Sequence, residues 1–319
     1  MALVVIFGLV FSAPLAAARS GRIVGHGTPA SCTSAAVVAA VRAGGTIRFD
    51  CGPDPVTIRM NATAKVRNTS ARVVLDGGGL VTLSGEGRRR ILYMDTCDRA
   101  QVWTTSHCDD QATPQLVVEN IAFADGNSTG QRFDGGGGGA IFDRCGRLRI
   151  LNSTFTANRC DHNGPDLGGG AVRALSQHHG LPVYVVGSRF TGNICSNGAA
   201  LSSIGVSWTV MNSRFVGNRA IGAGANPARP GSPGGGSGGA IYNDGDRMTL
   251  TISGSTFVDN HANEGGGAIF FVSNDRTGTM SIRNSTLKDN PNDVFHTPGL
   301  PGIYFLGARR PAITNSVLR

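Results

Sequence analysis

The sequence contains an eight-residue pattern in which apolar and polar positions alternate. Positions one and three are apolar in every copy, position five is Asn or Gly, position six is Ser in six copies, and position eight is Phe or Leu. Alternation with a period of two, rich in β-branched residues, predicts a short strand with one face buried. The copies cover residues 116–123, 148–155, 183–190, 208–215, 250–257, 280–287 and 311–318.

Two further motifs accompany the pattern. Three residues past the final Phe or Leu stands an Asn in five copies, and a Gly-Gly-Ala or Gly-Ala-Ala run followed by Ile, Val or Leu comes next. The spacing between copies varies, and nearly all of the variation lies in Gly-rich stretches. These features predict a parallel solenoid, in which each coil adds a rung about 4.8 Å from the last and equivalent side chains stack. The asparagines are 158, 193, 218, 260 and 290.

The fold class predicted from these repeats is all-β, a right-handed parallel β-helix. A propeller needs longer periods, an antiparallel sandwich would not keep one residue type at one corner, and leucine-rich repeats have a fixed length. Residues 33–43 predict a short helix that covers the first coil, with Ser31 or Thr33 as its N-cap. Early strands are expected at residues 46–49, 56–60, 73–75, 81–83 and 91–94.

The chain ends predict the domain organisation. Residues 1–18 read as a signal peptide, with an apolar run too short to span a membrane and Ala16–Ala18 as a cleavage site. Residues 19–319 form one β-helix domain. We therefore expect a secreted or cell-surface protein that is not transmembrane after signal removal. The seventh copy ends one residue before the sequence does, so we expect a longer solenoid or a partner over that coil.

Seven cysteines follow the predicted signal peptide. Two pairs are close in sequence, which suits local disulfides in an oxidising compartment. Cys160 and Cys195 each stand five residues after a block Phe, so stacking places them one rung apart, within disulfide reach. Cys145 is then the odd thiol. The expected bridges are Cys32–Cys51, Cys97–Cys108 and Cys160–Cys195.

The chain is basic, with a formal net charge of +8. One interpretation is an acidic partner, such as a uronate-rich polysaccharide, an anionic membrane surface or nucleic acid. The other is arginine-rich codon usage spread over a solvated surface. No basic helix or dense arginine tract occurs, which favours the second interpretation and predicts no nucleic-acid partner.

The Gly-Gly-Ala and Phe-x-x-Asn motifs resemble those of polymorphic outer-membrane proteins, and residues 74–79 (VLDGGG) are similar to an early coil of pectate-lyase-like β-helix proteins. The resemblance covers roughly residues 72–318 and implies the architecture. Its families include lyases, hydrolases and adhesins, so it does not imply one activity. The Asn-Thr-Asp and Gly-Asp-Asp clusters of polygalacturonases and the Trp-Ile-Asp-His stretch of pectate lyases do not occur here.

Polar candidates gather in two insertions between Phe155 and Phe190. A polysaccharide lyase needs a base and a cation that stabilises the carbanion. His178 or His179 would be the base, and Arg173 or Arg189 the cation. The alternative is a solvated loop without chemistry.

Four further residues are candidates for binding. Asp161, His162 and Asp166 are polar and share one insertion, and the two carboxylates are candidates for Ca²⁺. Trp103 is a candidate sugar-stacking platform. The run 107–110 (HCDD) has metal-ligand types, but a Cys97–Cys108 bridge removes its thiolate, so no metal or other cofactor is predicted.

The sequence favours a secreted or cell-surface β-helix that binds polysaccharide or serves as an adhesin or structural module. The alternative is a pectate-type lyase acting on an acidic glycan. No motif assigns an enzyme activity.

Overall fold

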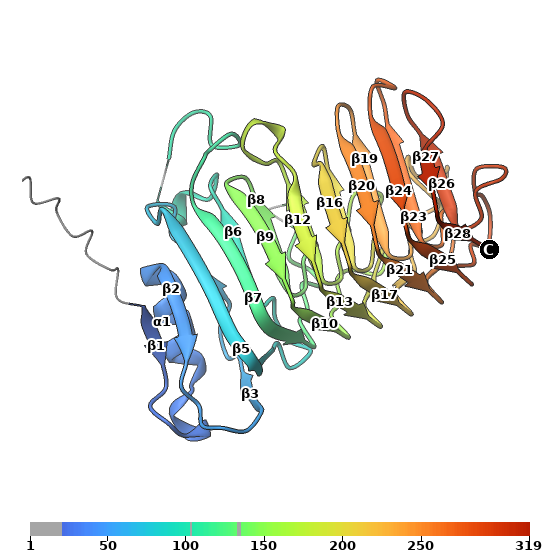
Figure 1. Cartoon of the computed structure of the whole chain (residues 1–319). Coiled ribbons are helices and arrows are strands. Elements are labelled where there is room, and N and C mark those ends of the chain that lie inside the picture. Colours follow the sequence, from blue (N-terminus) through green and yellow to red (C-terminus); the bar gives the residue numbers. More distant parts are fainter. Residues whose placement is uncertain (1–20, 103, 133–134) are drawn as a thin grey trace, which may run out of the picture.

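The computed structural model describes residues 21–102, 104–132 and 135–319. Its strands form long parallel sheets whose coils follow one another along a single axis, with the helix α1 (Ser34–Ala43) at the N-terminal end (Figure 1). The chain is therefore an all-β parallel β-helix, as predicted. The expected signal peptide, residues 1–18, lies outside the described residues. No helix in the described part of the chain is long and apolar enough to cross a membrane.

Three sheets contain the strands of the described residues. The 17-stranded sheet holds β1 (Arg22–Val24), β2 (Gly45–Phe49), β3 (Val56–Arg59), β5 (Arg72–Ser84), β7 (Gln115–Ala124), β9 (Arg147–Leu151), β10 (Thr154–Thr156), β12 (Val183–Val186), β13 (Arg189–Thr191), β16 (Trp208–Met211), β17 (Arg214–Val216), β20 (Thr249–Ser253), β21 (Thr256–Val258), β24 (Thr279–Arg283), β25 (Thr286–Lys288), β27 (Ala312–Thr314) and β28 (Val317–Leu318). The 8-stranded sheet holds β4 (Ala64–Lys65), β6 (Leu92–Asp95), β8 (Ile141–Arg144), β11 (Val172–Leu175), β15 (Leu201–Ile204), β19 (Ile241–Gly245), β23 (Ile269–Ser273) and β26 (Ile303–Leu306). The 3-stranded sheet holds β14 (Ile194–Cys195), β18 (Arg219–Ala220) and β22 (His261–Ala262).

The final position of the eight-residue pattern forms the centre of the core. Its phenylalanines pair in register and stack with ring centroids 4.4 to 5.1 Å apart and nearly parallel planes. All of them are fully buried. This spacing follows from the rung separation of a parallel sheet, which forces identical side chains into offset stacks. The stack consists of Phe123, Phe155, Phe190, Phe215 and Phe257.

The fifth position of the pattern makes the bend between paired strands. Asn or Gly at this position adopts φ between 46° and 60° in all seven copies. This left-handed conformation is open to glycine without steric cost and to asparagine more readily than to most residues. This requirement explains why only Asn and Gly occur at the fifth position of the pattern.

Two hydrogen-bonded ladders follow the bend. The predicted asparagine ladder is present, because each amide from Asn158 to Asn260 donates to the Oδ1 of the next Asn at 2.8 to 3.0 Å. A serine ladder, which the sequence analysis did not predict, runs beside it. The backbone N–H of each serine donates to the hydroxyl of the next at 3.1 Å. The five donors are Ser153, Ser188, Ser213, Ser255 and Ser285, and the ladder ends at Ser316.

The N-terminal coils contain the predicted helix and strands, together with β1 and β4, which were not predicted. Thr33 is the N-cap of α1, and its hydroxyl accepts from the N–H of Ala36. The strands expected at residues 73–75 and 81–83 form one element, β5, with a shift of register between Asp76 and Val81. Glycines 78 and 79 have positive φ and let the extra residues bulge without ending the strand.

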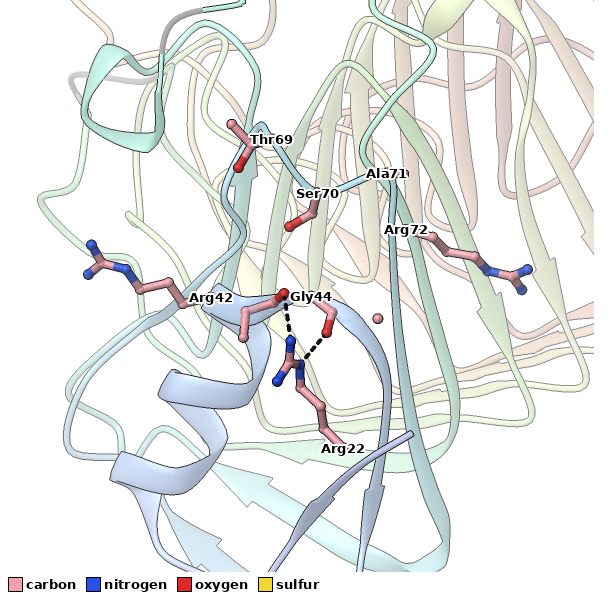
Figure 2. Close-up of a pocket in the computed structure, with 9 residues that line it drawn as sticks. Arg22, Arg42, Gly44, Thr69, Ser70, Ala71 and Arg72 are labelled. Carbon is pink, nitrogen blue, oxygen red and sulfur yellow. Dashed lines mark hydrogen bonds between the residues drawn. The ribbon is translucent and has the colours of Figure 1, made fainter. Parts of the chain in front are cut away.

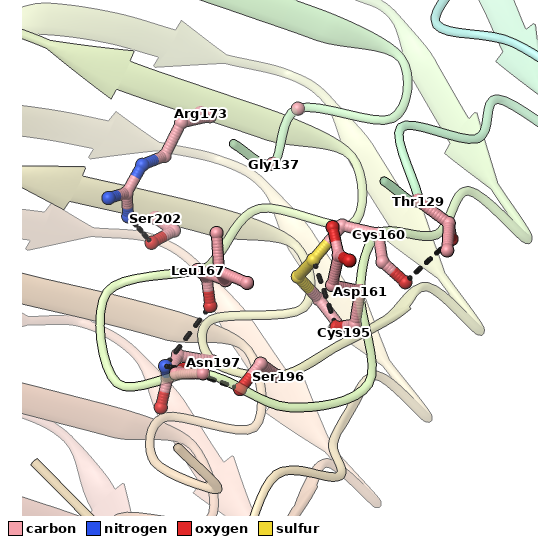
Figure 3. The surroundings of a disulfide bond; sticks show 12 residues. Thr129, Gly137, Cys160, Asp161, Leu167, Arg173, Cys195, Ser196, Asn197 and Ser202 are labelled. Carbon is pink, nitrogen blue, oxygen red and sulfur yellow. Dashed lines mark hydrogen bonds between the residues drawn. A yellow bond between two sulfur atoms is a disulfide. The ribbon is translucent and has the colours of Figure 1, made fainter. Parts of the chain in front are cut away.

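Three disulfides join the cysteine pairs expected from the sequence. Cys32 bonds Cys51, Cys97 bonds Cys108, and the third bridge joins adjacent coils (Figure 3). The Cα atoms of Cys160 and Cys195 lie 4.8 Å apart, the separation of one rung. Cys145 is free and buried.

Candidate functional site

An arginine-lined cleft lies at the N-terminal end of the solenoid (Figure 2). Its volume is about 500 Å³, and its walls are the end of α1, the start of β5 and the turn before β5. Arg22 projects from β1, Arg42 from the last turn of α1, and Arg72 from the first position of β5. Ser70 and Thr69 add hydroxyl groups, and no carboxylate lines the cleft.

The helix terminus fixes one of these arginines. Arg22 Nε donates to the Gly44 carbonyl at 2.7 Å, and its Nη2 donates to the Ala43 carbonyl at 3.4 Å. These carbonyls belong to the C-terminal end of α1, where orphan acceptors and the negative end of the helix dipole attract a cation. The C-terminal carbonyls of α1 therefore partly offset the positive charge of Arg22 and hold its side chain in place in the wall of the cleft.

Arg42 and Arg72 are exposed and lie on either side of Arg22, with their guanidinium groups directed away from each other (Figure 2). Neither has an acidic side chain within 4.0 Å among the residues that the structure describes. The charges are thus spread along a surface instead of converging on a single point. This arrangement suits a chain of anionic groups better than one small anion.

A second cleft of about 220 Å³ shares Arg42 and continues the basic surface. Lys65 on β4 and Arg67 after it line this cleft, again without a carboxylate. The Lys65 ammonium group lies 5.1 Å from the ring centroid of Tyr93 on the next coil. The two clefts form what we call the N-terminal basic strip, which consists of Arg22, Arg42, Lys65, Arg67 and Arg72.

Asp161, one of the predicted binding residues, is paired with an arginine of a neighbouring insertion. Its carboxylate is buried and accepts two hydrogen bonds from Arg132, at 2.9 and 3.1 Å, and a further one from the N–H of Gly130. Asp161 Oδ1 is therefore engaged within the protein, whereas Oδ2 accepts one backbone hydrogen bond, and the Ca²⁺ candidate at Asp161 stays a prediction. His162 and Asp166 of the same insertion are exposed.

Arg173, which contacts Ser202 in Figure 3, is buried. Its guanidinium group donates to the Ser202 hydroxyl and to the Asp166 carbonyl, each at 2.5 Å. Burial lowers the pKa of Arg173 to about 10. The insertion that contains Asp166 covers the outer face of β11, so Arg173 holds that insertion in place.

The two predicted histidines lie beyond the other end of β11, in the turn His178–Gly180. They meet Asp110 there, which comes from the loop between β6 and β7. His178 Nδ1 lies 3.1 Å from Asp110 Oδ1, and His179 Nε2 lies 3.7 Å from Asp110 Oδ2. The backbone N–H of His179 lowers the pKa of Asp110 by donating to its carboxylate.

The structure does not assemble the predicted lyase site. Arg173 is the second residue of β11, and its guanidinium group donates to the insertion before that strand, whereas His178 and His179 lie in the turn after it. Arg189 is exposed on β13, and its Nε donates to Thr191. Trp103, the candidate stacking platform, lies outside the described residues.

Sequence reasoning missed both groupings that the structure forms. The basic strip draws single residues from β1, α1, β4, β5 and the segments between them, and no local run of charge marks it. Asp110 was considered with its neighbours in sequence, whereas its partners stand 68 and 69 residues away. The predicted Cys97–Cys108 disulfide, which positions the loop that carries Asp110, was the sequence signal that pointed toward this grouping.

Comparison with known protein families matches a short segment of the chain. Residues 254–272 match the model of the Chlamydia polymorphic membrane protein repeat. This segment contains Phe257, Asn260 and the Gly-Gly-Ala run at residues 266–268, so it supports the resemblance drawn from those motifs. It fits a protein of the cell-surface or outer-membrane type. No curated protein and no solved structure matches the chain.

Proposed function

We propose that this protein is a cell-surface or secreted β-helix that binds an acidic polysaccharide through the N-terminal basic strip. The observation that carries the proposal is the pair of adjoining clefts that share Arg42 and are lined by basic residues with no carboxylate. Five cations on one end of the solenoid create a positive potential that attracts a polyanion.

The compartment favours a glycan over other polyanions. Three disulfides are typical of a protein outside the cytoplasm, where nucleic acid is not the usual acidic polymer. The match to a membrane-protein repeat supports the same location. Guanidinium groups bind carboxylates by paired hydrogen bonds, and the hydroxyls of Ser70 and Thr69 offer partners for sugar hydroxyls.

The test is binding of purified protein to immobilised polygalacturonate, with neutral dextran as a control surface. We expect binding to polygalacturonate alone, with an affinity that falls as salt rises, because exposed charges are screened. The double variant Arg42→Gln, Arg72→Gln should bind roughly tenfold more weakly. The matched control, Arg189→Gln with Arg214→Gln, removes two exposed arginines from β13 and β17 and should leave affinity unchanged.

Two results would overturn the proposal. One is equal binding to dextran and polygalacturonate, which would show that charge does not select the ligand. The other is an equal loss of affinity in both double variants, which would show that net charge matters and the basic strip does not. Ultraviolet absorbance of unsaturated products during the same experiment tests the alternative, lyase activity.

A further inference from the structure

Three side chains with metal-ligating atoms meet on the surface where the loop before β7 touches the turn after β11. Asp110, His178 and His179 each offer one ligand atom, and these atoms lie within 4.8 Å of one another. Among the described residues they are the one group of three such side chains. The group lies apart from the N-terminal basic strip and has no part in the proposed glycan binding.

The loop holds Asp110 in place independently of the histidines. The Cys97–Cys108 bridge closes the loop two residues before Asp110. On the other side, the N–H of Gln111 donates to the buried Cys145 sulfur at 2.8 Å. The N–H of Asp110 itself donates to the His107 carbonyl at 3.0 Å. A carboxylate anchored on both sides loses little freedom when it binds a ligand.

The backbone of the histidine pair is held in an uncommon conformation. His179 has a φ of 51°, which lies in the left-handed region that non-glycine residues seldom occupy. In this turn the two imidazoles stack with ring centroids 3.9 Å apart, so both nitrogen lone pairs point at one ion after a ring rotates about its side-chain torsions. The N–H of His179 donates to Asp110 at 2.6 Å and fixes the turn against the loop. The same left-handed φ occurs at the repeat bends of this chain, so here it orients the histidine pair and is not by itself a mark of function.

We propose that Asp110, His178 and His179 bind a divalent first-row transition metal ion, with Zn²⁺ as the representative. Two imidazole nitrogens and one carboxylate oxygen match the borderline ligand preference of Zn²⁺. Three protein ligands leave a fourth tetrahedral position for water, and the side chains of Asp110 and His179 are 46% and 71% exposed, so water reaches the site. The bound ion clamps the disulfide-closed loop to the neighbouring coil.

The donor set selects against Ca²⁺ and Mg²⁺. Those ions take six or more oxygen ligands and bind imidazole poorly. The site differs in residues and chemistry from the Ca²⁺ site considered for Asp161 and Asp166. It also needs both histidines, which sets it apart from the ordinary ion pair between His261 and Asp293, where Nε2 and Oδ1 lie 2.9 Å apart.

The test is calorimetric titration of untagged, metal-free protein with ZnCl₂, followed by Co²⁺ titration read from its visible absorption spectrum. We expect one equivalent of Zn²⁺ to bind and Co²⁺ to give the spectrum of a site with nitrogen ligands. His178→Ala, His179→Ala and Asp110→Asn should each weaken Zn²⁺ binding roughly tenfold or more. His261→Ala, which removes one partner of a His–Asp pair that has no second histidine, should bind Zn²⁺ as the wild type does.

Circular dichroism verifies that each variant is folded, and the double variant Cys97→Ser, Cys108→Ser gives an independent readout without freeing thiols that would themselves bind Zn²⁺. If the disulfide-closed loop anchors Asp110, this double variant should bind Zn²⁺ more weakly than wild type, and adding it to Asp110→Asn should have little further effect. The proposal is overturned if the wild type binds no Zn²⁺. It is equally overturned if the three site variants bind Zn²⁺ as tightly as His261→Ala.

Discussion

Asn218 lies in the middle of the asparagine ladder and makes the strongest test of how the coils are held together. Its side chain is fully buried. Its Oδ1 accepts from the backbone N–H and the side-chain amide of Asn193, at 3.1 and 2.8 Å. Its Nδ2 donates to the Phe190 carbonyl at 3.1 Å and to Asn260 Oδ1 at 2.8 Å. Four hydrogen bonds therefore depend on which end of the amide is the donor.

The change Asn218→Asp keeps the shape of the side chain and reverses the donor end. The two bonds accepted from Asn193 survive, and the two donated bonds become contacts between oxygens at the same distances. Two lost bonds cost about 1 kcal/mol each, and a carboxylate left buried without a cation brings the total to about 3–5 kcal/mol. This is a large part of the 5–15 kcal/mol that stabilises an ordinary domain.

The sign of the pH dependence follows from the same contacts. Burial and facing oxygens disfavour the ionised form, so the introduced carboxyl has a folded pKa above its unfolded value of about 3.9. The part of the destabilisation that comes from ionisation is absent below that unfolded pKa and grows as pH rises through the folded pKa. Guanidinium denaturation without reductant, at several pH values, measures the difference from wild type.

Asn284→Asp is the matched control for this change. Asn284 is exposed at a bend with a φ of 48°, a conformation that aspartate also adopts. We expect the free energy of unfolding of Asn284→Asp to stay within about 0.5 kcal/mol of the wild-type value. The ladder would not hold the coils together as described if Asn218→Asp differed from wild type by less than about 1 kcal/mol at neutral pH.

Three other changes test the core, the bridge between coils and a buried acid. Phe215→Ala removes one ring from the stack and should cost about 3–5 kcal/mol in denaturant unfolding, whereas a cost under about 1 kcal/mol would show that the stack is not tightly packed. Cys160→Ser with Cys195→Ser opens a 35-residue separation and should cost about 4 kcal/mol by chain entropy; an unchanged unfolding midpoint would contradict this. Burial raises the pKa of Asp143 well above its ordinary 3.8, so its proton binds more tightly in the folded state and stability falls as pH rises through the folded pKa. Asp143→Asn cannot ionise, so its melting temperature should be higher than that of wild type at neutral pH, and the two melting temperatures should converge below pH 3.8. A difference in melting temperature that stays constant across this pH range would refute the account.

The sequence by itself determined the coil. A strand with one buried face, a left-handed bend and a buried amide each need particular residues at fixed offsets within one repeat, so the pattern can be read without knowing the coils' neighbours. Stacking then followed from repetition, because equal offsets place equal side chains on successive rungs. The Phe stack, the asparagine ladder and the Cys160–Cys195 bridge were predictable for this reason.

Only the tertiary structure decided the chemistry of the surface. Insertions between the repeats have no period, so their sequence does not say which residue they bring to which coil. One insertion covers Arg173 and another supplies Arg132 to Asp161, so both predicted site residues are engaged within the protein. A third loop carries Asp110 to histidines 68 and 69 residues further on. The basic strip likewise forms where α1 and the first coils meet, because folding brings together single charges that lie apart in the chain.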